Sequence, residues 1–249
     1  MHRDIRTTED VLCLLDRLFL PEADRWTDGA SDWWDAFYAD RTADRPFFVP
    51  KPDENLVSYL DRGLLAAPGR VLDLGSGPGR NAVHLASLGF EVDAVDLSPT
   101  AVAWARERAA EAGADVRFHC GNIFDVELPH RQYDLVYDSG CLHHLPPHRR
   151  ISYLALLDRV LAPGGLLVVN AFAAGAMGCE LPDEELYRNG RLEGGLAYTP
   201  DELRHLFSDF TEIEIRPMVP QPAGSPLFGI PVLLSALFRR PAAGRPLSF

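Results

Sequence analysis

Short apolar runs alternate with longer amphipathic stretches along the chain from residue 70 onwards. This alternation is typical of a parallel β-sheet whose two faces are covered by helices. The apolar runs predict seven strands, at 71–74, 91–95, 116–119, 133–137, 165–171, 210–216 and 230–238. We therefore expect an α/β fold with a doubly wound, mostly parallel sheet.

Helix start and stop signals lie between these runs. Ser98 and Pro99 form an N-cap and a first-turn proline for a helix over 99–112, which Gly113 ends. A second predicted helix, 147–161, stops before a Pro-Gly-Gly segment, and a capping box that begins at Thr199 opens a third. The connections between the strands are therefore long enough for helical crossovers.

The remaining segments suggest how the chain is organised. An amphipathic helix at 11–20 and an aromatic-rich helical turn at 31–38 precede the first strand. We divide the chain into an N-terminal helical cap, a core, a lid insertion within that core and a flexible tail: 1–69, 70–240, about 174–198 and 241–249.

Composition excludes several kinds of function. A formal net charge of −12, with Lys51 as the only lysine, argues against binding nucleic acid. No apolar run approaches the roughly 18–20 residues of a membrane span, so no membrane partner is expected. The four cysteines form no Cys-x-x-Cys pair, which favours a reducing compartment, and we expect a cytoplasmic protein.

A glycine-rich turn follows the first predicted strand and precedes a helix. Its glycines, Gly75, Gly77 and Gly79, would let the backbone approach a ligand closely. A dinucleotide site requires Gly-x-Gly-x-x-Gly, but Arg80 stands where the third glycine would fall. Asp73, just before the turn, suits a cationic ligand better than a phosphate. The spacing therefore argues against an NAD-dependent oxidoreductase.

Polar residues follow the next three predicted strands. Asp96 lies nineteen residues beyond Gly77, where a carboxylate can accept both ribose hydroxyls. Asn122 offers an amide to the edge of an adenine ring, and Ile123 offers an apolar face. Because the ends of parallel strands meet at one edge of a sheet, we expect a nucleoside site there.

With these motifs the chain resembles the class I S-adenosylmethionine-dependent methyltransferases. Three further segments carry the same resemblance: the strand at 133–136, His143-His144-Leu145-Pro146 and Leu161-x-Pro163-Gly164-Gly165. The resemblance covers about residues 50–240 and implies a Rossmann-like, seven-stranded sheet with an antiparallel last strand and helices on both faces. A looser likeness at 34–38 and 47–48 is to small-molecule members, including the thiol, halide and thiopurine methyltransferase-like group.

The family resemblance implies a role for each matching residue. The methionyl part of S-adenosylmethionine would lie on Gly75, Ser76 and Gly77, and Asp73 would orient its ammonium through water. The remaining contacts would be Asp96 and Leu97 on the ribose, Asn122 and Ile123 on the adenine, and Asp138 and Ser139 near the sulfonium or the ammonium.

Aromatic and histidine side chains are the candidates for the reacting centre. Trp34, Tyr38 and Phe47 could stabilise a sulfonium through cation–π attraction. His143, and as a second choice His144, could act as a general base, with Asp138 as a further catalytic candidate. We expect no metal, because Pro146 and Pro147 prevent the nearby histidines from sharing one helical face.

The expected activity is direct in-line transfer of a methyl group to an oxygen, nitrogen or sulfur atom of a metabolite or natural-product intermediate. Two alternatives stay open: a cyclase or isomerase that binds the same cofactor without transferring methyl, and a non-catalytic nucleoside-binding module. We expect a monomer or a homodimer.

Overall fold

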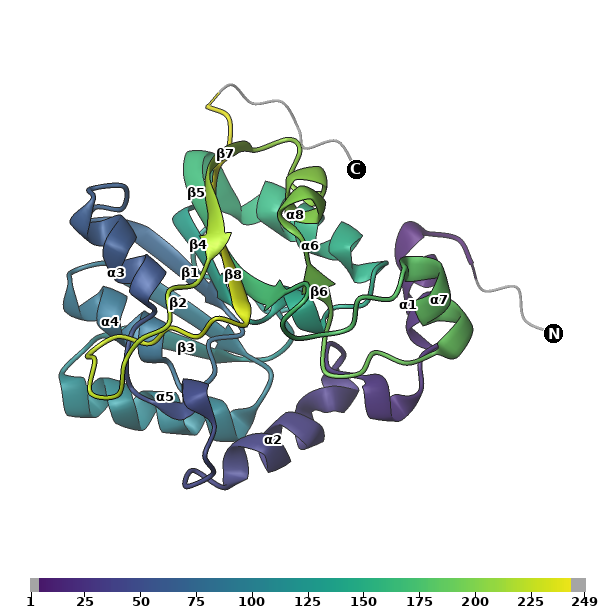
Figure 1. Ribbon diagram of the computed structural model, residues 1–249, viewed down its shortest axis with the longest axis horizontal. Helices are drawn as coiled ribbons and strands as arrows, with labels where there is room; N and C mark the ends of the chain where they lie inside the picture. Colours follow the sequence, from purple (N-terminus) through teal and green to yellow (C-terminus); the bar gives the residue numbers. More distant parts are fainter. Residues whose placement is uncertain (1–4, 243–249) are drawn as a thin grey trace.

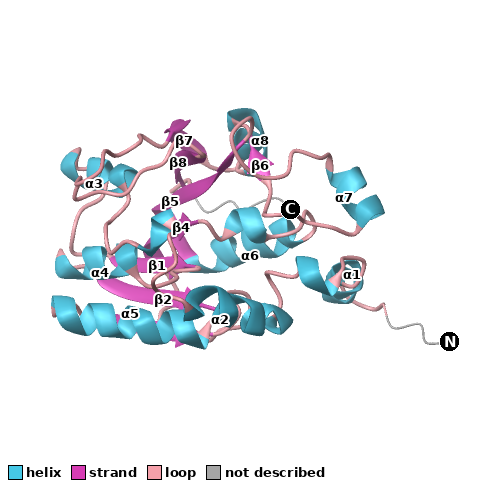
Figure 2. Cartoon of the chain, turned by 60° about the horizontal axis from the view of Figure 1, so that its bottom comes forward, coloured by secondary structure: helices cyan, strands magenta, loops and turns pink. Residues whose placement is uncertain are grey.

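The computed structural model of the protein describes residues 5–242. A central sheet is flanked by helices on both faces (Figures 1 and 2). Its strands are β1 (Arg70–Leu74), β2 (Glu91–Asp96), β3 (Val116–Cys120), β4 (Tyr133–Ser139), β5 (Leu161–Ala173), β6 (Ala197–Tyr198), β7 (Thr211–Pro217) and β8 (Leu233–Arg239).

The strand order is β3-β2-β1-β4-β5-β8-β7, with the short β6 paired to β5 beside this path. Strands β1 to β5 are parallel to their neighbours, whereas β8 is antiparallel to both β5 and β7. The predicted mostly parallel sheet with an antiparallel last strand is confirmed, and the short β6 adds an eighth strand to the seven predicted. The chain moves outward from β1 to β3 and then returns to β4, so β1 lies at the point where ligands bind in such sheets.

Alternate side chains of the central strands serve two separate cores. Leu72 and Leu74 of β1 pack in a cluster with Tyr153 of α6 (Arg149–Val160) and Leu203 of α8 (Pro200–Leu206). Val71 points to the opposite face, where it packs with residues of α3 (Glu54–Asp61) and α4 (Arg80–Ser87). Burial on both faces explains the continuous apolar runs of the sequence.

The predicted helix starts are confirmed where a capping side chain defines them. Ser98 accepts the Ala101 N–H at 3.0 Å at the start of α5 (Pro99–Ala112), and Gly113 ends the helix at φ +62°. The N-terminal helix α1 (Thr8–Asp16) begins earlier than the predicted 11–20, because Thr7 and Asp10 form a capping box. The sequence patterns missed α3 and the two-residue strand β6.

Residues 5–69 contain α1, α2 (Ser31–Ala39) and α3, and the segment after β5 contains α7 (Asp183–Asn189). Helix α2 packs on α5, where Asp35 accepts hydrogen bonds from the Ser98 hydroxyl and, at 2.9 Å, from the Thr100 N–H. The segments around α1 and α7 meet where the Leu20 N–H donates to the Gly190 carbonyl at 2.8 Å. The two segments therefore contact each other beside the carboxyl ends of the strands (Figure 1).

The division into cap, core and lid stays a prediction, and the predicted tail at 241–249 falls outside the described residues from 243 on. None of the helices within residues 5–242 is both long and apolar enough to cross a membrane.

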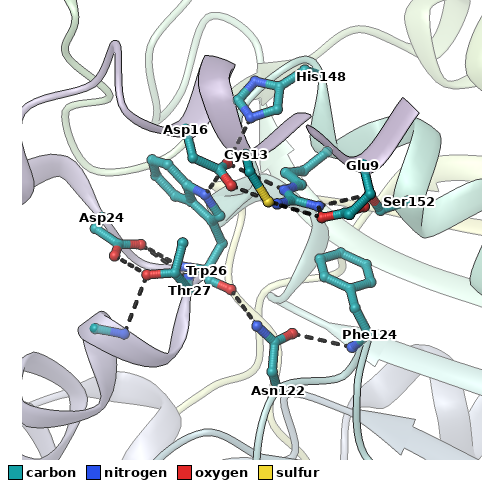
Figure 3. A network of polar contacts seen from close by, with 12 residues as sticks. Glu9, Cys13, Asp16, Asp24, Trp26, Thr27, Asn122, Phe124, His148 and Ser152 are labelled. Atoms are coloured by element: carbon teal, nitrogen blue, oxygen red, sulfur yellow. Dashed lines mark hydrogen bonds and ion pairs between the residues drawn. The ribbon is translucent and has the colours of Figure 1, made fainter. Parts of the chain in front are cut away.

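Buried polar contacts anchor α1 to the start of α6 (Figure 3). Asp16 accepts hydrogen bonds from Trp26 Nε1 at 2.8 Å and from Arg149 Nη2 at 2.5 Å, and it contacts His148 Nε2 at 2.7 Å. Burial alone would raise the pKa of Asp16, but the hydrogen bonds from His148, Arg149 and Trp26 outweigh it and hold this pKa well below its usual value. The carboxylate therefore stays ionised and neutralises a buried guanidinium.

Replacing Asp16 with alanine should lower the free energy of unfolding by about 3–5 kcal/mol, because Arg149 is left buried without its main counterion. Urea denaturation measures this loss. Glu9→Ala is the matched control, since Glu9 is an exposed partner of the same arginine, and its loss should be about 1 kcal/mol or less. Equal losses in the two variants would contradict the anchoring role of Asp16.

Candidate functional site

A cavity of about 480 Å³ lies at the carboxyl edge of the sheet. It is within the range of about 300–1,000 Å³ that sites for small organic molecules occupy. The predicted site residues that line it are Trp34, Tyr38, Phe47, Gly75, Asp96, Leu97, Asn122, Ile123, Ser139, His143 and His144. The structure thus brings together residues from the N-terminal segment and from the ends of four parallel strands.

The glycine turn forms one wall of the cavity through Gly75, and Gly77 lies behind that wall. Gly75 and Gly77 have φ values of +62° and +52°. A Cβ atom on Gly75 would lie 2.9 Å from the Cβ of Cys141, and one on Gly77 would lie 3.0 Å from the Tyr38 hydroxyl. Glycine is therefore required by conformation and by space at both positions.

Asp96 joins the end of β2 to the glycine turn. Its carboxylate accepts the Gly77 N–H at 2.7 Å and the Ser98 N–H at 2.9 Å, and the residue also lines the cavity. Burial raises the pKa of Asp96 to about 6, although these hydrogen bonds oppose the rise. The free lone pairs of the carboxylate can accept hydroxyl groups of a ligand, as predicted for a ribose.

Asp73, Ser76 and Gly77 lie behind this wall and do not line the cavity. Asp73 is 2% exposed, and its pKa is raised well above the usual value by burial and then by the charge of Asp53. The Ser76 hydroxyl is buried and has no hydrogen-bond partner within the described residues. Direct contact between Asp73 and a ligand in the cavity is therefore disfavoured, and its predicted contact through water stays a prediction.

Asp138 is fully buried beneath the loop after β4 and does not line the cavity. Its carboxylate accepts the N–H groups of Gly140, Cys141 and Leu142 at 2.8–3.1 Å and the Tyr153 hydroxyl at 2.9 Å. The geometry therefore makes Asp138 a positioning residue for the loop that carries His143 and His144. A direct catalytic role of Asp138 stays a prediction, and the position of its carboxylate outside the cavity disfavours that role.

The side-chain amide of Asn122 is already engaged. Its Nδ2 donates to the Trp26 carbonyl at 3.0 Å, and its Oδ1 accepts the Phe124 N–H at 3.1 Å (Figure 3). Asn122 thus attaches the N-terminal segment to the turn after β3. Ile123 lines the cavity beside it, so an apolar contact with an adenine ring fits better than an edge contact from the amide.

Aromatic rings from the N-terminal segment form the opposite wall. Trp34 and Tyr38 stack with their centroids 6.0 Å apart, and Phe37 and Phe47 stack at 5.9 Å. Further apolar lining comes from distant segments, namely Phe172, Met177, Leu192, Phe228, Ile230, Val232 and Leu233. The cavity therefore combines a polar end at the glycine turn with an apolar, aromatic end.

The two candidate bases have different surroundings. His143 is 4% exposed, stacks on Phe172 at 3.8 Å and keeps a buried Nδ1 without a hydrogen bond in the described residues. His144 is more exposed to the cavity and lies edge-on to Trp34 at 5.0 Å. Burial, helped by the charge of Arg25, lowers the pKa of His144 to about 3, and burial lowers that of His143 well below its usual value. Both rings are neutral at pH 7, and the geometry favours His144 as the one that meets a ligand.

Sequence patterns missed several polar residues of the site. Arg25 and Arg45 line the cavity without any motif that marks them, and Arg80 was noted only as a missing glycine. Asp53 is fully buried below the cavity and binds Arg80, Asn81 and the hydroxyl of Tyr137. No group of three or more possible metal ligands lies within residues 5–242.

Comparison with known proteins identifies this arrangement. A family model described as a methyltransferase domain matches residues 71–165, which span the glycine turn, Asp96, Asn122 and the histidine loop. This segment of the chain is a class I S-adenosylmethionine-dependent methyltransferase domain.

Named relatives agree with this assignment. The chain is 31% identical over 168 residues to a ubiquinone biosynthesis O-methyltransferase of Xanthomonas euvesicatoria pv. vesicatoria, covering 64% of this chain and 66% of the relative. It is 26% identical over 170 residues to a 2-heptyl-1-hydroxyquinolin-4(1H)-one methyltransferase of Mycobacteroides abscessus, covering 68% and 69%. The match thus spans just under two thirds of the first of these relatives.

Solved structures extend the likeness over more of the chain. A structure from work on the conversion of a disulfide bond into a thioacetal group during echinomycin biosynthesis has a TM-score of 0.66 and 26% identity, covering 86% of this chain and 93% of that chain. The fold is also that of the Burkholderia thailandensis 1,6-didemethyltoxoflavin-N1-methyltransferase, with a TM-score of 0.57, 24% identity and coverage of 97% and 93%.

The residues of this methyltransferase family member fit S-adenosylmethionine, the cofactor of the family. Gly75 brings backbone against the cavity, and Asp96 presents a carboxylate beside it. Trp34 and Tyr38 offer aromatic faces that suit a sulfonium.

Gly77→Ala should weaken binding of S-adenosylhomocysteine by at least roughly tenfold, equivalent to about 1.4 kcal/mol, because the new methyl group meets the Tyr38 hydroxyl. Calorimetric titration measures the affinity. Gly89→Ala is a matched control, since Gly89 also has a positive φ, +90°, but open space around its Cβ position. Both variants should lose stability, and only Gly77→Ala should lose affinity.

Proposed function

We propose that the protein transfers a methyl group from S-adenosylmethionine to an oxygen, nitrogen or sulfur atom of a small, largely apolar molecule. One observation carries this proposal: a continuous cavity joins the glycine turn and Asp96 to an aromatic wall that includes His144. When bound, the cofactor supplies a methyl group attached to a positively charged sulfur. The protein's own residues must then hold both molecules in line and exclude water.

The cavity walls account for positioning and desolvation. Trp34, Tyr38 and Phe47 cover the site from the N-terminal segment, and Met177 and Leu192 cover it from the segment after β5. The Asn122 contact to Trp26 and the Asp35 contacts to α5 hold the N-terminal segment in place. Together these elements restrict the access of water to the space above the glycine turn.

The apolar lining supports an acceptor that is itself mostly apolar or aromatic. The relatives are named for ubiquinone biosynthesis and for a hydroxyquinolinone, both ring systems, which supports the same class here. A net charge of −12 disfavours a nucleic-acid acceptor. We further infer a cytoplasmic location from the four unpaired cysteines.

We assign the role of proton acceptor to His144. A neutral imidazole can accept a proton from an acceptor hydroxyl or N–H as the methyl group is transferred. His143 packs against Phe172 and is better placed to hold His144, whose ring lies 4.4 Å from its own. Acceptors that need not lose a proton would not require this base.

The test of the function is calorimetric titration with S-adenosylmethionine, S-adenosylhomocysteine and NAD, followed by an acceptor screen. Both sulfur compounds should bind, NAD should not, and Asp96→Ala should abolish binding, whereas Asp115→Ala, which removes an exposed carboxylate, should not. Stoichiometric release of S-adenosylhomocysteine with an acceptor separates methyl transfer from cyclisation or isomerisation. Failure of the folded wild-type protein to bind either sulfur compound would overturn the proposal.

For an acceptor that loses a proton, His144→Phe should lower kcat by roughly 10²–10⁴-fold and leave the affinity for S-adenosylhomocysteine unchanged. Phenylalanine preserves the ring contact with Trp34 but has no proton acceptor. Because the pKa of His144 is about 3, protonation of His144 should not reduce the wild-type kcat between pH 8 and pH 5. An unchanged kcat in the variant would exclude His144 as the base.

A further inference from the structure

One guanidinium beside the aromatic wall has unused hydrogen-bond donors. Arg25 lines the cavity, and its guanidinium carbon lies 3.5 Å from the ring centroid of Trp33. Its Nη1 donates to the carbonyl oxygens of Glu22 at 2.9 Å and Asp24 at 2.5 Å. Its Nε and Nη2 form no hydrogen bond to any residue within 5–242, and neither atom is fully buried. These two donors are therefore available to a ligand.

The charge of Arg25 has no carboxylate partner. The guanidinium forms no ion pair within the described part of the chain. The acid next to it in sequence, Asp24, accepts the N–H groups of Trp26 and Thr27, both at 3.0 Å, and the Thr27 hydroxyl. Burial lowers the pKa of Arg25, and the charge of Asp24 opposes this only as the smaller effect. A partly buried guanidinium of this kind is stabilised when an anion binds to it.

Arg25 lies close to His144, to which we assign the role of proton acceptor. After burial, the charge of Arg25 is the further cause that lowers the pKa of His144. Trp34 connects the two residues, because its Nε1 donates to the Arg25 carbonyl at 3.1 Å and its ring lies 5.0 Å from that of His144. The unused donors and the proton acceptor therefore line the same part of the cavity.

The other two arginines that line the cavity act elsewhere. Arg80 pairs with the buried carboxylate of Asp53. The charges of Arg80 and Arg45 oppose the rise that burial causes in the pKa of Tyr38, whose hydroxyl lies over the glycine turn. Arg25 is therefore the lining arginine whose charge acts on the proton acceptor.

The surroundings of Arg25 suit an acceptor that carries a single charge. Much of the remaining lining is apolar, including Phe172 and Met177. The carboxylates of Asp44 and Asp96 also line the cavity, but neither forms an ion pair with Arg25. Apolar walls with one available guanidinium match an apolar ring that bears one acidic group.

We propose that Arg25 binds an anionic oxygen of the acceptor beside His144, so that the acceptor is an acidic ring compound. This inference rests on the proposed function and narrows its acceptor class. Where the anionic oxygen is the reacting one, its proton passes to His144 and the negative charge left on the oxygen is stabilised by the guanidinium. Where it belongs to a carboxylate substituent, Arg25 orients the ring instead.

Stabilisation of an acceptor anion also fits the weak basicity of His144. A ring whose pKa is about 3 takes a proton poorly from an ordinary hydroxyl group. A positive charge close to that hydroxyl favours its ionised form and lowers its pKa. Arg25 therefore reduces the mismatch between the acceptor and the base.

Two matched pairs of probes test the contact on the protein loaded with S-adenosylhomocysteine. 4-Nitrophenolate and 4-nitrobenzoate carry an anionic oxygen, and 4-nitrotoluene and 4-nitrobenzamide are their neutral counterparts. Calorimetry should show at least one anion bound roughly 10- to 100-fold more tightly than its counterpart, as expected for a charge-assisted hydrogen bond. Arg25→Gln should remove this difference, and Arg25→Lys should keep part of it because the charge remains. Arg17→Gln, which changes an exposed arginine outside the cavity, should leave the difference unchanged.

The two anions identify the source of the charge. Preference for the phenolate assigns Arg25 to the reacting hydroxyl, and the visible absorbance of this probe should then show a higher ionised fraction in the site than in solution at the same pH. Preference for the benzoate alone assigns Arg25 to a carboxylate substituent. This inference is overturned if the wild-type protein prefers neither anion, absence of binding included, or if the preference survives in folded Arg25→Gln.

Two measurements keep this inference separate from the proposed function. Thermal unfolding and the affinity for S-adenosylhomocysteine show whether each variant keeps its fold and its cofactor site. A wild-type protein that does not bind S-adenosylhomocysteine would reject the proposed function itself, whereas binding of S-adenosylhomocysteine without any preference for an anion rejects only the role of Arg25.

Discussion

The carboxylate of Asp96 connects the parts on which the site depends. It accepts a backbone N–H from the glycine turn and another from Ser98, and Ser98 caps the helix that follows. That helix start is also where Asp35 attaches α2 and its aromatic wall. Hydrogen bonds within a few residues of one another thus hold together the strand end, the glycine turn, the helix cap and the N-terminal segment. Burying this carboxylate is unfavourable for the isolated charge, and the backbone donors offset that penalty.

The N-terminal segment is a structural part of the site. It supplies Trp34, Tyr38, Arg45 and Phe47 to the cavity, and it is attached through Asn122 and through the cluster around Asp16. The match to the family model begins only at residue 71, so these walls lie outside the shared core. The matched segment supplies the glycine turn, Asp96 and the histidine loop, whereas the covering half of the cavity comes from residues outside the match.

The backbone scaffold and its ligand-facing edge could be predicted because local signals define them. The strands appear as apolar runs, the α5 start as Ser98-Pro99, and the turn as closely spaced glycines with positive φ. The hydrogen-bond partners of individual side chains could not be predicted in this way. Asp138 could face a ligand or accept hydrogen bonds from three backbone N–H groups, depending on the path of the residues that follow it. The sequence pattern of a strand that ends in an aspartate is the same in both cases.

The roles of the remaining site residues depend on tertiary contacts. Asn122 is engaged by Trp26, which lies 96 residues away, so the turn sequence alone carries no sign of it. The Nε of Arg45 is buried without a hydrogen-bond partner within the described residues, and no local sequence pattern marks this. Which of the two histidines is free to meet a ligand likewise depends on a tertiary contact, because Phe172 covers the ring of His143.

The segment after β5 touches the histidine loop directly. A Cβ atom on Gly195 would lie 2.8 Å from the His143 carbonyl oxygen, and the Leu196 N–H donates to that carbonyl at 2.6 Å. Changes of length or sequence in this segment would therefore shift the histidines while the glycine turn and Asp96 stay in place. Under the proposed function, such a division would separate acceptor choice from cofactor recognition, and this loop would be the place to start directed evolution of new specificities.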